Sequence, residues 1–140
     1  NERQGEYRMD IIKILGIGMT AAMLAVLLKG YKPELAMQIS LAAAALIFVM
    51  AVPYLRSAVS MFQDIAAQVG MDNRLIGIVI KIIGIAYLAQ FGAELCKDAG
   101  EGAIASKIEL AGKLIIMTMS MPIMYKLLAL VNDIVSLNGR

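Results

Sequence analysis

Long apolar stretches separated by short polar segments are the main feature of this chain. Apolar residues dominate positions 11–28, 35–55, 75–95 and 110–131. Each stretch has the length of an α-helix that crosses the hydrocarbon core of a bilayer, which takes about 20 residues. The pattern therefore predicts an all-α integral membrane protein with about four transmembrane helices.

The segments between these stretches carry signals for helix starts and stops. Pro33 suits the first turn of a helix, because its missing N–H would have no partner there. Gly70 is typical of a residue that follows a helix, and Asp72 can cap the helix after it. Pro122 predicts a kink in the fourth helix.

The segment from position 55 to position 69 has a different pattern. Its apolar residues recur at the spacing of one face of an α-helix, with polar residues opposite. This pattern predicts a separate amphipathic helix between the second and third spans. Its polar face is only sparsely basic, so we favour a helix in the membrane interface over one docked on a partner.

A short internal repeat links the first and third spans. Residues 11–17 align with residues 79–85 at an offset of 68 positions, with a lysine and a glycine in register. In residues 11–17, the lysine is Lys13 and the glycine is Gly16. Each match opens a unit of two spans, so we predict two parallel two-helix repeats with both termini on one side of the membrane.

The length of 140 residues leaves room for one membrane domain, which we place at residues 9–140. Its predicted repeat units are residues 9–70 and 72–140. Met9 precedes the first apolar run directly, and we interpret it as the natural start. Residues 1–8 are then an upstream extension.

Composition supports the membrane and narrows the chemistry. Hydrophobic residues make up 60% of the chain, whereas about 45–50% is usual for soluble domains. The net charge of +2 includes no run of Lys or Arg, which argues against a nucleic-acid partner. The chain has no histidine and one cysteine, Cys96, so an internal disulfide is excluded and the usual zinc and haem ligand sets are missing. We expect no metal, no cofactor and no enzymatic activity.

The densest group of polar residues lies in a charged connector, residues 97–107, after the third span. Ser106 opens a Ser-x-x-Glu capping box that predicts the start of the last helix. If the third helix continued outward, Gln90, Glu94 and Glu101 would share one face with Lys97. This face could bind an ion or a partner, or the connector could be a solvated loop broken by glycines. The candidate contact residues are Lys81, Gln90, Glu94, Lys97, Asp98, Glu101, Lys107, Glu109 and Lys113.

Lys81 stands apart from this connector, inside the third span. An ionisable residue at membrane depth is costly and often functional, so Lys81 could be an ion partner. It could instead extend its long side chain to the headgroup region. We favour the second interpretation, because Lys81 lies close to the start of its span.

Three stretches give the chain a resemblance to a known family. Residues 9–14, 81–94 and 98–113 resemble the stage III sporulation protein AC/AD family. The similarity extends from Met9 to about Asn132 and is weaker over residues 56–72.

The resemblance implies a small non-enzymatic membrane subunit of a secretion-like channel complex in endospore-forming bacteria. Such a subunit would lie in the mother-cell membrane around the engulfed forespore and support forespore development. The implied partners are membrane lipid and other stage III sporulation A proteins, including an ATPase, the AC relative and ring-forming subunits, and a homo-oligomer is compatible with this role.

Two other functions are compatible with the sequence. An independent transporter or channel for ions or small solutes would use Lys81, Gln90 and Glu94 to line its path. A membrane enzyme would need a convergent set of catalytic groups, and the sequence offers no such set.

Overall fold

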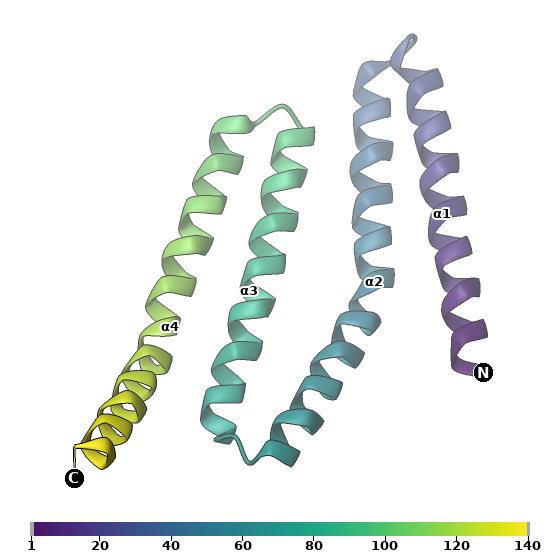
Figure 1. Cartoon of the computed structure of the whole chain (residues 1–140). Coiled ribbons are helices and arrows are strands. Elements are labelled where there is room, and N and C mark those ends of the chain that lie inside the picture. The colour runs from purple at the N-terminus through teal and green to yellow at the C-terminus, as the bar shows by residue number, and fades with distance from the viewer. Residues whose placement is uncertain (1, 140) are drawn as a thin grey trace. The chain divides into compact units, whose positions relative to one another are not determined.

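A computed structural model describes residues 2–139, and over this range the protein is all-helical (Figure 1). All of its helices are long and apolar enough to cross a membrane. The prediction of an all-α membrane protein with four spans is confirmed. The helices are α1 (Glu2–Lys29), α2 (Pro33–Val69), α3 (Asn73–Asp98) and α4 (Gly102–Asn138).

Several helix ends lie where the sequence signals predict them. α2 begins at Pro33. After α2, Gly70 adopts a φ of 77°, a left-handed conformation that glycine reaches without steric cost. The N–H of Met71 then donates to the carbonyl of Ala66 at 3.0 Å, which closes the helix end. Asp72 caps α3, because its Oδ1 accepts the N–H of Arg74 at 3.0 Å.

The amphipathic segment 55–69 is helical, as predicted, but it is the second half of α2 rather than a separate helix. No glycine interrupts α2, and Pro53 is accommodated inside it. A helix of 37 residues is about 55 Å long, well beyond the ~30 Å of a hydrocarbon core. Unless α2 tilts strongly, its amphipathic end extends beyond that core.

The predicted start of the fourth helix is wrong. α4 begins at Gly102, so Ser106 lies one turn inside the helix instead of capping it. Gly100, with a φ of 84°, reverses the chain directly after α3, and helical structure resumes at once. The connector that we placed at residues 97–107 therefore shrinks to a turn of three residues, 99–101.

Residues 2–8 lie before the predicted membrane domain, and they form the first turns of α1. In the second half of the chain, α4 changes direction along its length (Figure 1), and it contains Pro122. A proline removes one backbone hydrogen bond and crowds the preceding turn, which is the usual cause of such a bend.

The chain forms two compact units. One holds the chain up to Ala58 with residues 97–101, and the other holds residues 59–96 and the chain from Gly102 onward. Few side chains are buried in either unit, and most large apolar ones are exposed. Such a surface suits lipid as the surrounding solvent. The buried apolar residues in the described range are Ala36, Ala66, Ile76, Ala93 and Ala105.

Small residues bring α3 and α4 together. A Cβ atom added at Gly112 would lie 2.6 Å from the Cβ of Ala89, closer than such atoms approach in proteins. A Cβ added at Gly92 would lie 3.7 Å from the Cγ2 of Ile108, an ordinary contact. Helices in lipid gain little from a hydrophobic effect, so close packing of small residues is a main source of their association.

Candidate functional site

The candidate site is the polar end of the α3–α4 hairpin, which we define as residues 90–113. It comprises the last turns of α3, the turn at 99–101 and the first three turns of α4. The contacts of Gly92 with Ile108 and of Ala89 with Gly112 set the antiparallel register of the two helices. In this register, Glu94 on α3 lies at about the level of the residues just before Ile108 on α4.

Part of the predicted polar face on α3 is present. The Nε2 of Gln90 donates to the Oε1 of Glu94 at 3.3 Å, an i,i+4 contact along the helix. The predicted extension of this face to Glu101 is wrong, because α3 ends at Asp98 and Glu101 lies in the turn. The face on α3 therefore ends with Lys97, in the last turn.

The contact between α3 and α4 in this part of the chain is made by small apolar residues. Ala93, Ala105 and Gly112 are the buried residues in this part of α3 and α4. Most of the predicted contact residues are exposed, namely Gln90, Glu94, Lys97, Asp98, Glu101, Lys107 and Lys113. Glu109 is half-buried and has a partner of its own. The hairpin is thus held by small residues, and most of its charged side chains are exposed.

The polar end carries both signs of charge, with three lysines (Lys97, Lys107 and Lys113) and four acidic residues (Glu94, Asp98, Glu101 and Glu109). Such a mixed surface can discriminate between partners by charge. Within residues 2–139, no group of three or more His, Cys, Asp or Glu side chains could hold a metal ion. Cys96 is a half-buried free thiol.

Lys81 does not join this group. It is exposed on α3, nine residues before Gln90, which is about 14 Å along the helix axis. It lies eight residues after Asn73, the first residue of α3. The structure therefore separates Lys81 from the polar end.

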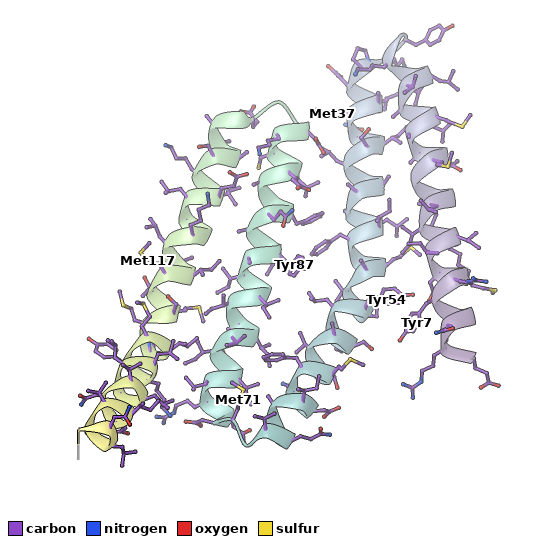
Figure 2. All side chains as sticks on the ribbon, viewed as in Figure 1. Tyr7, Met37, Tyr54, Met71, Tyr87 and Met117 are labelled. Carbon is purple, nitrogen blue, oxygen red and sulfur yellow. The ribbon has the colours of Figure 1, made fainter. Side chains whose placement is uncertain are left out.

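Two polar contacts between helices were absent from the sequence analysis. The first joins α1 and α2, where the Oη of Tyr54 donates to the Oδ2 of Asp10. The ring of Tyr7 lies against that of Tyr54 with centroids 5.7 Å apart, and Figure 2 shows the two side chains directed toward each other. Tyrosine and aspartate inside apolar helices could have signalled this contact, but only the antiparallel pairing of α1 with α2 brings them together.

The second contact joins α4 to the turn before α3. The ammonium group of Lys126 donates to the Oδ2 of Asp72 and forms an ion pair with it. This hydrogen bond from Lys126, helped by the backbone N–H of Arg74, lowers the pKa of the Asp72 carboxyl from its ordinary value. Asp72 thus caps α3 and ties it to α4.

The fold and the polar end define a class, that of small multispan membrane proteins with a charged hairpin end. The sequence profile of the stage III sporulation protein AC/AD protein family matches residues 11–65 and 79–134. The chain is 44% identical to stage III sporulation protein AD of Bacillus subtilis (strain 168) over 117 residues, which cover 84% of this chain and 88% of that relative. No solved structure matches the chain.

The chain therefore belongs to the stage III sporulation protein AC/AD family. This membership supports a role in sporulation, and the family is not a known enzyme family.

Proposed function

We propose that the protein is a non-enzymatic membrane subunit of a channel complex that links the mother cell to the forespore and supports forespore development. Membership of the sporulation family is the observation that carries this proposal. In this proposal, the protein lies in the mother-cell membrane around the engulfed forespore. Its partners are other stage III sporulation A proteins, including the ATPase, the AC relative and the ring-forming subunits.

The polar end gives this proposal a physical basis. Charged side chains at the end of an apolar hairpin can pair with complementary charges on a partner protein and so select that partner. We propose that Glu101 in the turn and Lys107 on α4 contact a partner subunit, since both are exposed.

The first experiment is a gentle-detergent pull-down of a tagged copy from sporulating cells, with the co-purifying proteins identified by mass spectrometry. Recovery of the sporulation ATPase and the ring-forming proteins would support the channel subunit. Recovery of this chain alone, despite normal expression and extraction, would contradict it and favour an independent transporter. Flux in liposomes that contain this protein alone would then be measured.

Charge reversal tests the proposed contact surface. Glu101→Lys and Lys107→Glu should each reduce the recovery of partner proteins, because a reversed charge meets like charge at the interface. Lys32→Glu is the matched control, since Lys32 is an exposed charge in the turn between α1 and α2. Unchanged recovery with both Glu101→Lys and Lys107→Glu would refute the proposed contact through these two residues.

A further inference from the structure

The structure extends the internal repeat well beyond the short match found in the sequence. α2 and α4 each contain 37 residues, and Pro53 and Pro122 each occupy the twenty-first position of their helix. The two helices are thus equivalent at an offset of 69 positions. Near their ends, the Asp-Ile pair at 64–65 corresponds to the same pair at 133–134.

α1 and α3 are equivalent at an offset of 68 positions. The two stretches matched by the family profile begin at residues 11 and 79, which differ by the same 68 positions. The face of α1 that packs inside the first hairpin also corresponds to the face of α3 that packs inside the second. For example, Ala21 on α1 and its equivalent on α3, Ala89, are both half-buried.

Within the second compact unit, the end of α2 packs beside α3 (Figure 1). Ala66 on α2 is only 2% exposed, and Val59 on the same face is half-buried. On α3, Ile76 is buried, and the positions that continue its face are half-buried. These half-buried positions are Val79, Ile80 and Ile83.

The equivalent faces of α4 and α1 are uncovered, each within its own compact unit. Val135, the equivalent of Ala66, is 63% exposed, and Leu128, the equivalent of Val59, is exposed as well. On α1, Ile12 is 65% exposed, whereas its equivalent Ile80 is half-buried. The two faces that meet between α2 and α3 thus recur, unpaired, at the end of α4 and the start of α1. The uncovered residues are Leu128, Val131 and Val135 on α4, with Ile11, Ile12 and Leu15 on α1.

We infer that a second copy of this chain covers these faces. The end of α4 in one copy packs against the start of α1 in the next, repeating the contact that α2 makes with α3. The contact is head-to-tail, because two different surfaces meet, so it generates a ring where the rotation closes. The inference is independent of the proposed channel function.

The internal contact favours a second copy over lipid as the occupant. Lipid could cover any apolar face, but the two uncovered faces are the equivalents of two faces that already fit each other. One position departs from the repeat, since Arg8 stands where α3 has the buried Ile76. The contact therefore begins at Ile11 and extends toward Leu15.

Disulfide cross-linking in membranes tests this contact. Two differently tagged copies, both carrying Cys96→Ser, are co-expressed in a bacterial host that makes no sporulation proteins. One copy carries Val131→Cys and the other Ile12→Cys. Oxidation should give a cross-linked heterodimer that carries both tags. In the control pair, Ala129→Cys replaces Val131→Cys, because Ala129 is exposed on the opposite side of α4 at similar depth.

The outcomes separate the possible occupants. A heterodimer from the Val131 and Ile12 pair that is lost in the Ala129 control supports the inference. No heterodimer, or equal amounts from both pairs, would overturn it and leave lipid, the other unit of the same chain or another protein as the occupant. Val131→Gln serves as a second test in copies without added cysteines. It should lower co-purification of the two tagged copies from the same host, and unchanged co-purification would also count against the contact.

Discussion

The closest approach between α3 and α4 offers a sharp test of how the hairpin is held together. A Cβ added at Gly112 would lie 2.6 Å from the Cβ of Ala89, where carbon atoms prefer about 3.5–4.0 Å. The Gly112→Ala variant must therefore push the two helices apart or distort them. Overpacking of this kind typically costs about 1–3 kcal/mol.

Gly112→Ala also stabilises the helix itself, and a control variant corrects for this gain. Alanine inside a helix is more stable than glycine by about 0.5–1 kcal/mol. Gly84→Ala on α3 should gain the same helix stability without a clash, because nothing lies within 4 Å of a Cβ added at Gly84. The free energies of unfolding of the two variants should differ by the overpacking cost of about 1–3 kcal/mol, or about 5- to 150-fold in the unfolding equilibrium.

The assay is unfolding by SDS in mixed detergent micelles, followed by the reaction of Cys96 with a maleimide dye. Cys96 is the single thiol of the chain and is half-buried on α3, so opening of the hairpin should raise its reactivity. Gly112→Ala should unfold at a lower SDS fraction than Gly84→Ala. Equal midpoints for the two variants would refute the close α3–α4 packing on which the register of the polar end depends.

Four further predictions concern three polar residues. Asp72→Asn keeps a capping oxygen but loses the ion pair with Lys126, so it should destabilise the protein less than Asp72→Ala; equal losses in SDS unfolding would contradict the capping role. Because the pKa of Asp72 is lowered, its ionised carboxylate stabilises the folded protein at a pH above the ordinary carboxyl pKa. This stabilisation is lost as the pH falls through the lowered pKa. Asp72→Asn should therefore make the stability of the protein depend less on acid pH. Tyr54→Phe removes the donor to Asp10 and should lower the melting temperature in detergent, whereas an unchanged value would show that the hydrogen bond contributes no stability. Lys81→Ala should still give a folded protein that resists carbonate extraction from membranes, and loss of insertion would show that Lys81 has a structural partner.

At the polar end, the prediction was right within α3 and wrong about where α3 ends. Gln90 and Glu94 were predicted to share a face because helical periodicity is local, and their hydrogen bond bears this out. The prediction for Glu101 failed because it depended on where α3 ends. That end is set by the left-handed turn at Gly100, and α4 begins before the capping box at Ser106. Helix ends depend on a balance between competing local signals, so their positions are harder to read than the helices themselves.

The membrane as solvent, the fold class and most of the helices follow from the sequence alone. Stretches of about 20 apolar residues are long enough to cross a bilayer, and backbone groups in lipid must find their partners within the helix. The turn signals at Pro33, Gly70 and Asp72 also acted locally, so they could be read directly.

Which distant residues meet depends on the tertiary structure. The pairing of Asp10 with Tyr54, and of Asp72 with Lys126, depends on the antiparallel register of two helices. That register is set by the fit of small residues such as Gly112 and Ala89, whose importance no local pattern reveals. The uncovered faces of α1 and α4 became visible for the same reason, because exposure is a property of packing and not of the residue.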